Sequence, residues 1–213
     1  MRAFKLCCLA ASVVLGAMAF SAGASADSVC KVKEAPCSGA NAWATGTVFE
    51  AKIKTGTQFK FDGARHYVCS GSTRSDRLVS NMTLKGLPDT LEPKSETYTG
   101  CVSEELGFCT ATTASLQHSQ WLADTAGTWN GSAKAPSSAA SITFNCSTEL
   151  NCKWLYHEQI AHTFKGGSPA IEFFKAQYVR SSESPWGCGI EVIVQGEREI
   201  TSPNTSPIYW SYG

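Results

Sequence analysis

The sequence has no excess charge of either sign, no long apolar run after its N-terminal segment and little sign of helical periodicity. Its 213 residues carry 18 basic and 18 acidic side chains, and only 17% of the residues are charged. This balance argues against a basic nucleic-acid surface and against an acidic disordered tail. Apolar residues make up 43% of the chain, which is enough for a folded core, so the composition favours one globular domain.

Sequence motifs of several enzyme classes are also missing. The chain contains no G-x-G-x-x-G or P-loop pattern, which argues against a nucleotide cofactor. It contains no G-x-S-x-G turn of the kind that carries the nucleophile of many serine hydrolases. We therefore expect no cofactor and no metal, and local pattern identifies no catalytic residue.

One string resembles a metal motif without matching it. The residues from His157 to His162 read HEQIAH, one residue longer than the HExxH motif of zinc proteases. Residues five apart do not share one face of a helix, and on a strand an odd interval sends the two side chains to opposite faces. Neighbouring aromatic residues favour a strand here, so the string predicts no zinc site.

An extracellular hydrolase whose catalytic residues are scattered in the sequence is the alternative function. The candidates for a glycosidase-type carboxylate pair are Glu104, Glu105, Glu172, Glu191, Glu197 and Glu199. In Glu197-Arg198-Glu199, the alternation of a strand places both glutamates on one face. We interpret this face as solvated and partly screened by Arg198, so the pair does not by itself indicate catalysis.

The first 26 residues have the layout of a secretory signal peptide. Arg2 and Lys5 are followed by an uncharged run from Leu6 to Phe20 and by Ala24-Ser25-Ala26. The run is shorter than the roughly 20 apolar residues that a membrane-spanning helix needs. We expect residues 27–213 to form a secreted domain, extracellular or associated with the cell envelope, with no integral membrane segment and a net charge of about −2.

The cysteines predict a disulfide-stabilised domain. Eight cysteines lie beyond the predicted signal peptide, and an even number in an exported chain indicates four disulfides. They are Cys30, Cys37, Cys69, Cys101, Cys109, Cys146, Cys152 and Cys188. One hypothesis pairs Cys30 with Cys37, Cys101 with Cys109 and Cys146 with Cys152 in short loops, and Cys69 with Cys188 over a long range. Zinc is disfavoured because CxxC spacing is absent.

Alternation of apolar and polar residues indicates strands through most of the chain. Residues 49–53 and 59–62 alternate around the turn Thr55-Gly56-Thr57, which predicts a hairpin with one solvated face. Between Ile171 and Val179 the alternation shifts by one residue, which predicts a bulge near Phe173 and Phe174. Many short strands favour an all-β fold, an antiparallel β-sandwich or barrel-like domain.

The domain organisation is predicted to be simple. The segment from Ser132 to Ser141 is rich in alanine and serine around Pro136, so we expect it to be flexible. A domain boundary there would leave three cysteines in the second part, an odd number. This favours a single domain with at least one disulfide that crosses the segment.

Aromatic residues near loops and the C-terminus are the candidate ligand contacts. Exposed tryptophan and tyrosine rings bind the C–H faces of sugars and the surfaces of partner proteins. Trp186 lies between Pro185 and Gly187, and Tyr209 and Trp210 lie near the chain end, so we expect these three aromatic residues to be exposed. The predicted function is non-enzymatic binding of a glycan or protein surface, or a structural role, at the cell envelope.

The pattern of cysteines and turns resembles that of an uncharacterised family of exported proteins from high-GC Gram-positive soil bacteria. The resemblance rests on Val29-Cys30-Lys31-Val32-Lys33-Glu34-Ala35-Pro36-Cys37, Thr45-Gly46-Thr47, residues 51–57, Cys101 with Cys109, Phe144-Asn145-Cys146 to Cys152, residues 166–170, and Gly187-Cys188 to residues 200–203. It spans most of the predicted mature chain. It implies a bacterial exported protein but no activity, ligand or catalytic residue, because the shared positions are scaffold residues.

An inhibitor or toxin with an exposed loop closed between Cys101 and Cys109 is a third possible function.

Overall fold

The computed structural model shows a protein built almost entirely from antiparallel β-strands. It describes residues 28–35, 37, 39–81, 89–116, 119–123, 127–134, 140–147, 150–157, 161–203 and 207–211. The strands are β1 (Ser28–Cys30), β2 (Val48–Ile53), β3 (Phe59–Gly63), β4 (His66–Ser80), β5 (Asp89–Ser103), β6 (Gly107–Ala114), β7 (Ser119–Ala123), β8 (Gly131–Lys134), β9 (Ser141–Cys146), β10 (Asn151–Tyr156), β11 (Ala161–Lys165), β12 (Ala170–Arg180), β13 (Glu191–Ser202) and β14 (Tyr209–Ser211). Two short 3-10 helices are η1 (Gly39–Asn41) and η2 (Trp186–Cys188). The predicted all-β fold class is confirmed, and the predicted signal peptide lies outside the described residues.

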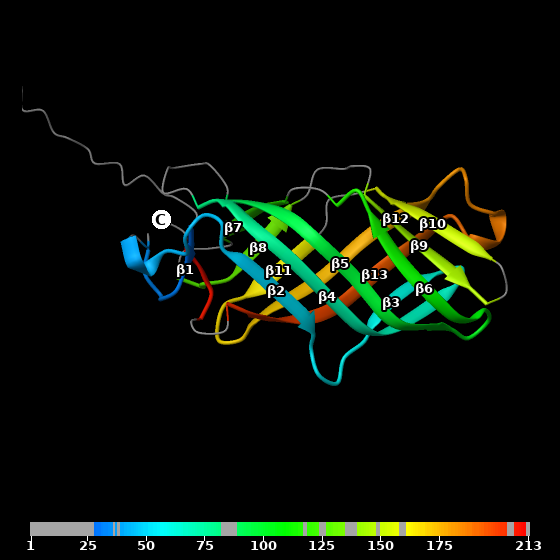
Figure 1. Cartoon of the computed structure of the whole chain (residues 1–213), viewed down its shortest axis with the longest axis horizontal. Helices are drawn as coiled ribbons and strands as arrows, with labels where there is room; N and C mark the ends of the chain where they lie inside the picture. Colours follow the sequence, from blue (N-terminus) through cyan, green and yellow to red (C-terminus); the bar gives the residue numbers. More distant parts are fainter. Residues whose placement is uncertain are drawn as a thin grey trace, which may run out of the picture.

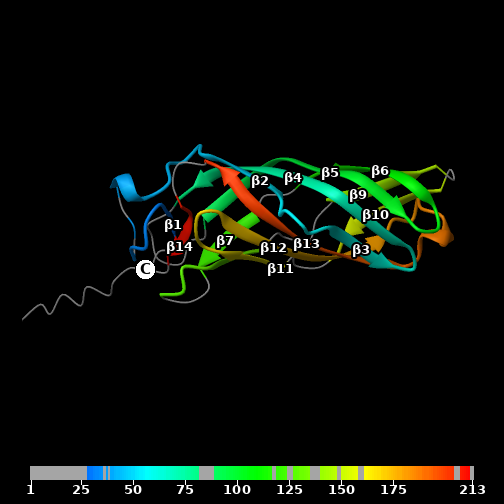
Figure 2. The same cartoon turned by 90° about the horizontal axis from the view of Figure 1, so that it is seen from below.

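Four long strands, β4, β5, β12 and β13, run along the molecule and organise the sheet (Figure 1). β4 pairs with β5, and β12 pairs with β13. Two sets of shorter strands connect β5 to β12 by successive pairing. Strands β6, β9 and β10 do so in one half of the molecule, and β7, β8 and β11 in the other. Between β13 and β4 lies β3 in the first half and β2 in the second, each paired with both long strands. In both halves the pairing returns to its starting strand, so the sheet closes on itself, with β4 and β5 opposite β11 and β12 (Figure 2).

The interior of this closed sheet holds two apolar cores with a layer of charged side chains between them. The disulfide-side core includes Phe59, Phe61, Tyr67, Phe144, Trp154, Val192 and Val194. The terminal-side core includes Val29, Phe49, Leu78, Leu91, Phe164, Ile200 and Trp210. The charged layer consists of Arg74, Asp76, Glu96, His162, Glu172 and Arg198, all buried. On β12 the inward residues read Ala170, Glu172, Phe174, so one strand passes from one core through the layer into the other.

The eight described cysteines form four disulfides, as predicted, but only one predicted pairing is right. Cys30 is bonded to Cys37. The other three bonds join Cys69 to Cys101, Cys109 to Cys146 and Cys152 to Cys188. Strand pairing explains the error, because Cys69 lies opposite Cys101 in the β4–β5 register and Cys109 opposite Cys146 in the β6–β9 register. Because Cys101 also lies opposite Cys109 in the β5–β6 register, the four cysteines form one cross-strand row, and the bonds join its two outer pairs.

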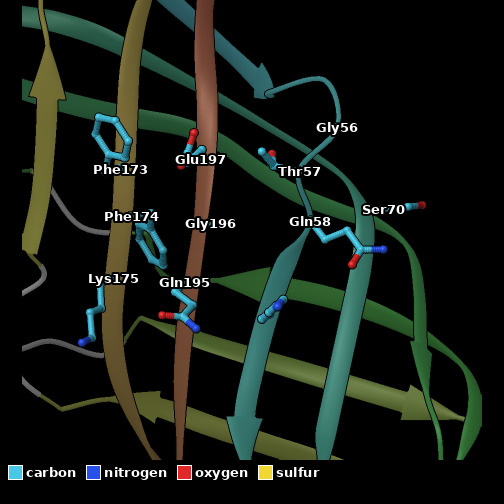
Figure 3. Close-up of a pocket in the computed structure, with 11 residues that line it drawn as sticks. Gly56, Thr57, Gln58, Ser70, Phe173, Phe174, Lys175, Gln195, Gly196 and Glu197 are labelled. Carbon is cyan, nitrogen blue, oxygen red and sulfur yellow. The ribbon is translucent and has the colours of Figure 1, made fainter.

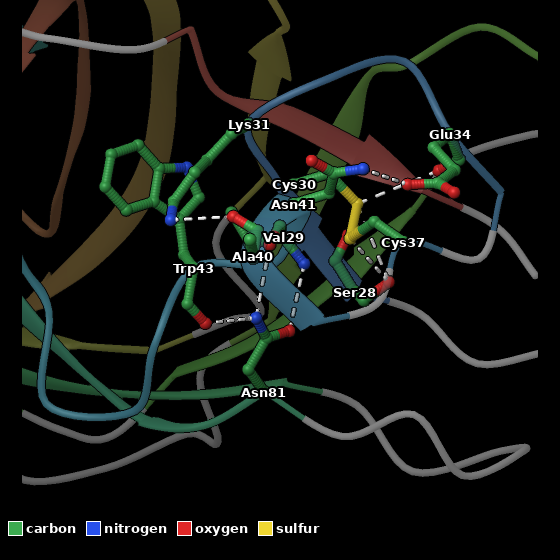
Figure 4. The surroundings of a disulfide bond; sticks show 10 residues. All are labelled: Ser28, Val29, Cys30, Lys31, Glu34, Cys37, Ala40, Asn41, Trp43 and Asn81. Carbon is green, nitrogen blue, oxygen red and sulfur yellow. Dashed lines mark hydrogen bonds between the residues drawn. A yellow bond between two sulfur atoms is a disulfide. The ribbon is translucent and has the colours of Figure 1, made fainter.

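The short strands β1 and β14 form a separate two-stranded sheet at the end of the molecule that holds the terminal-side core (Figure 1). The Asn81 side chain ties this end to β4, because its amide oxygen accepts from the Val29 N–H at 3.1 Å and its amide nitrogen donates to the Trp43 carbonyl at 2.6 Å. The Cys30–Cys37 disulfide closes the adjoining loop (Figure 4). This end therefore has one local disulfide, whereas the opposite half has the three long-range ones.

Two local predictions on β8, β9 and β12 fare differently. The predicted bulge near Phe173 is wrong, since β12 keeps a continuous register with β13 from Ala170 to Val179. The shift in alternation arises because Glu172, a charged residue, faces inward. In the segment predicted to be flexible, Ser132 lies in β8 and Ser141 begins β9, while residues 135–139 lie outside the described residues.

No helix among the residues that the structure describes has the length and apolarity needed to cross a membrane.

Candidate functional site

One strand of the closed sheet is interrupted by a loop. β2 ends at Ile53 and β3 begins at Phe59, and both strands pair with β13 on one side and β4 on the other. They are therefore two halves of one interrupted strand, and the predicted hairpin between them is wrong. Between the paired positions Arg198–Ile53 and Gln195–Lys60, β13 has two residues, Gly196 and Glu197, whereas the segment that joins β2 to β3 has six, residues 54–59. The surplus residues leave the sheet as a loop that protrudes from the molecule (Figure 1).

The loop has a defined shape because its own residues and β13 hold it. The Thr57 backbone N–H and hydroxyl both donate to the Lys54 carbonyl, at 3.0 and 2.7 Å. Gly56 has a φ of +82°, which favours glycine at this turn. Lys54 in turn donates its backbone N–H to the Glu197 carbonyl at 3.0 Å and its ammonium to the Glu197 carboxylate at 2.7 Å. The predicted turn signal was thus correct, although it produces an outward loop and no hairpin.

Glycine at position 196 allows close packing beneath the interruption. A Cβ added to Gly196 would lie 2.6 Å from Cδ2 of Phe59. The Phe59 ring therefore occupies the space that a side chain at 196 would take, and the Arg198 guanidinium stacks on that ring at 4.4 Å. Phe59 lies in the disulfide-side core and is fully buried. The interruption is therefore closed on its inner side by an aromatic ring that contacts the charged layer.

A hollow of about 740 Å³ lies on the outer side of the interruption (Figure 3). Its described lining residues are Gly56, Thr57, Gln58, Lys60, Ser70, Phe173, Phe174, Lys175, Gln195, Gly196 and Glu197. They come from the loop, from β3 and β4, and from the neighbouring strands β12 and β13. The hollow is thus lined by amide, ammonium, hydroxyl and carboxylate groups together with one outward-facing aromatic ring.

Strand register aligns three of these side chains in one cross-strand row. Lys60 on β3 lies opposite Gln195 on β13, and Gln195 lies opposite Lys175 on β12. All three are exposed on the outer face. The Gln195 amide donates to Asp62 at 3.1 Å, which orients the glutamine between the two lysines.

Phe173 provides the apolar surface of the hollow. It lies opposite Glu197 in the next row of the register, and its side chain is 38% exposed. Glu197 is the only carboxylate among the described lining residues, and it is already paired with Lys54. A glycosidase mechanism uses two carboxyl groups that flank the scissile bond, and the described lining of the hollow contains one.

The charged layer is a second polar cluster, but the protein interior encloses it. Arg198 donates to Ser72 at 2.9 Å, to Glu172 at 3.1 Å and to Tyr98 at 3.1 Å, and it also pairs with Glu96. Arg198 is fully buried. The prediction that Arg198 screens a solvated face is therefore wrong, although Glu197 and Glu199 do share the outer face.

The remaining contacts of the charged layer determine its protonation. The Arg74 guanidinium binds both carboxylate oxygens of Asp76, at 2.7 and 2.9 Å, and His162 Nδ1 lies 2.6 Å from Glu172 Oε1. Burial alone would raise the pKa of Glu172, but the charge of Arg198 and the bond to His162 hold it far below its usual range. Burial lowers the pKa of His162, against the opposing influence of Glu172. His162 is therefore a structural residue in the layer.

The three predicted ligand aromatics do not come together. Trp186 in η2 is 82% exposed, as predicted, but the Arg180 guanidinium stacks 3.8 Å from its ring centre. Tyr209 is half-buried in β14. Trp210 is only 2% exposed because it stacks on Phe164 in the terminal-side core, so its predicted exposure is wrong. The elements that carry them, η2 and β14, lie at opposite ends of the molecule (Figure 1).

The other candidate residues are dispersed. Glu104 and Glu105 lie in the turn between β5 and β6, Glu191 begins β13, and Glu172 is in the charged layer. His157 follows β10 and His162 lies in β11, with residues 158–160 outside the described residues. Within the described part of the chain, no group of three or more histidine, cysteine, aspartate or glutamate side chains is placed to hold a metal ion.

Sequence reasoning missed the hollow because no local motif marks it. Lys60, Phe173 and Gln195 are ordinary outward residues of alternating strands, and only the pairing of β3, β13 and β12 brings them together. The chain matches no protein-family model, no curated protein and no solved structure at a significant level. The hollow itself is therefore the feature of this chain that bears on its function.

Proposed function

We propose that the protein is an exported, non-enzymatic binding protein that holds a glycan in the hollow over the strand interruption. The observation that carries this proposal is the position of Phe173 beside the row of Lys60, Gln195 and Lys175. Sugar rings present a C–H face that packs on an aromatic ring and hydroxyl groups that need hydrogen-bond partners. The hollow offers both kinds of contact within one surface.

The scaffold suits a binding role. The row lies on paired strands, and side chains on regular elements are held more precisely than side chains on loops. All eight described cysteines are bonded in pairs, which supports export, since disulfides persist in oxidising surroundings. Action at or outside the cell envelope fits both the disulfides and the signal-like N-terminal segment.

Affinity electrophoresis of the purified mature protein in gels that contain individual polysaccharides tests the proposal. We expect at least one polysaccharide to retard the protein, and Phe173→Ala to weaken that binding about tenfold because the stacking surface is lost. Phe108→Ala is the matched control, since Phe108 is 79% exposed and lies on β6 outside the hollow.

Two results would count against the proposed function. One is the absence of retardation in every gel of a panel that includes neutral and acidic polysaccharides. The other is binding that survives Phe173→Ala and is lost in Trp186→Ala, which would move the site to η2. A circular dichroism spectrum of each variant excludes unfolding as the cause of lost binding.

A further inference from the structure

The lysines in and beside the hollow differ in whether a carboxylate already neutralises them. Lys54 is paired with Glu197 at 2.7 Å. Lys60 and Lys175 form no ion pair with any other described residue, and both are exposed on the outer face of the sheet. Because a free ammonium beside a binding surface favours a negative group there, these two lysines bear on the class of ligand.

The register sets the spacing of these two positive charges. Lys60 and Lys175 lie on either side of Gln195, on strands that flank β13. Adjacent strands are about 4.8 Å apart, so the two lysine backbones are roughly 10 Å apart. Long, flexible lysine side chains on such a spacing can converge on one anionic group or contact two successive ones. The Gln195 amide between them provides a further polar contact.

The nearby acidic residues offset these charges only in part, because Lys54, Lys60 and Lys175 stand against Glu197 and Asp62, which leaves one positive charge in excess. Asp62, one row away, accepts a hydrogen bond from Gln195 and lies 3.4 Å from His66 Nδ1. Glu197 is held by Lys54. The predicted mature chain has a net charge of about −2, so attraction for an anion is a local property of the hollow and not of the whole protein.

We infer that the ligand is an acidic glycan, whose anionic group lies between Lys60 and Lys175 while a sugar ring packs on Phe173. This inference rests on the proposed function. Neutral polysaccharides would use only the hydrogen-bonding and stacking contacts, whereas a carboxylate or sulfate on the ring adds charge-assisted hydrogen bonds to the lysines. Binding should therefore weaken as salt rises, since the pairs are exposed.

A pair of polymers with the same sugar backbone tests the charge requirement. Polygalacturonate carries one carboxylate per sugar, and its fully methyl-esterified form carries none. We expect the mature protein to bind polygalacturonate at least tenfold more tightly than the ester at low salt. The double variant Lys60→Gln, Lys175→Gln should lose that preference, while Lys165→Gln, an exposed lysine on β11 outside the hollow, should keep it.

The possible results separate the inference from the proposed function. Equal binding of both polymers that is lost in Phe173→Ala and unchanged in the double lysine variant would overturn the acidic-ligand inference and leave the glycan site standing. Equal binding of polygalacturonate and polyglutamate, a polyanion without sugars, would show that only charge is read and would overturn the inference as well. If the wild-type protein binds neither of these polymers and no other polysaccharide of the electrophoresis panel, both the acidic-ligand inference and the proposed function are overturned.

Discussion

The charged layer and the two apolar cores are built from the same strands but are stabilised in different ways. On β13 the inward residues Val194 and Ile200 bury apolar surface, and between them Arg198 forms hydrogen bonds and ion pairs. An apolar residue gains from any dense packing. A buried charge is tolerated only when partners of opposite charge surround it. Alternation thus decides which residues of a strand face inward. Whether an inward residue can be charged depends on whether the neighbouring strands place partners of opposite charge beside it.

The largest expected effect comes from removing the central charge of the layer. Arg198→Met leaves Glu96 and Glu172 buried without their principal partner, so we expect a loss of about 3–5 kcal/mol in the free energy of unfolding. Urea unfolding of the mature protein measures it. Arg77→Met, which removes an exposed pair with Glu92, is the control and should cost far less, because water and salt screen an exposed ion pair.

A combined variant sharpens the same comparison. Replacing Arg198, Glu96 and Glu172 together by Met, Leu and Leu removes all three charges, so neither glutamate is left buried without an ion-pair partner. Because the desolvation cost disappears with the charges, this variant should be more stable than Arg198→Met alone. If the combined variant is the less stable of the two, the pairing explanation of the layer is wrong.

The disulfides test the difference between the two ends. Loss of the Cys152–Cys188 bond, which spans 36 residues, should destabilise the protein by about 4 kcal/mol in the loop-closure model. Loss of Cys30–Cys37, which spans seven residues, should cost about 2.5 kcal/mol. Paired Cys→Ala variants, compared by urea unfolding under the same conditions, measure both. An equal or reversed order would show that loop length does not govern their contributions.

In the apolar cores, volume should matter more than exact chemistry. Leu78 is fully buried in the terminal-side core, so Leu78→Ala should lose about 3 kcal/mol through the cavity it leaves. Leu78→Met conserves volume and should lose less than about 1.5 kcal/mol. By contrast, Arg198→Lys conserves charge but removes the forked donors that contact several partners, and it should remain strongly destabilising. Similar losses from Leu78→Met and Arg198→Lys in urea unfolding would remove the distinction.

The smallest expected effect is a pH dependence from His162. Burial holds its pKa in the folded state below the ordinary 6.5, so the unfolded chain binds more protons just below that pH. The contribution of His162 to stability is therefore present above pH 6.5 and is lost as the pH falls toward the folded-state pKa. As the pH is lowered from about 7.5 to 5.5, the free energy of unfolding should decrease in the wild type and change less in His162→Gln.

The fold class was predictable because alternation is a local property. Phe49, Ala51 and Ile53 turn inward as their spacing predicts, with Glu50 and Lys52 outside. The sequence rule failed where polarity was used to decide direction. Glu172 and Arg198 were assigned to a bulged strand and to a solvated face, since nothing near them in the chain shows that they meet across β12 and β13.

The candidate site was less predictable than the fold. Of the three predicted ligand aromatics, Trp186 is exposed but stacked by Arg180, and Trp210 is in the core. The hollow depends on a loop that leaves the sheet between two halves of one strand. The turn at Gly56 was visible in the sequence, but a turn between two strands is compatible both with a hairpin and with an interruption.

By itself, the amino-acid sequence determined the strands, the faces of most of them and the presence of eight cysteines available for disulfides, because these follow from residue type and short-range spacing. Only the tertiary structure decided which strands are neighbours. That choice brought Cys69 beside Cys101 and Cys109 beside Cys146, placed Arg198 among its partners and aligned Lys60 with Lys175. The reason is that cross-strand contacts join residues far apart in the chain, and their energies depend on a register that all strands of the closed sheet establish together.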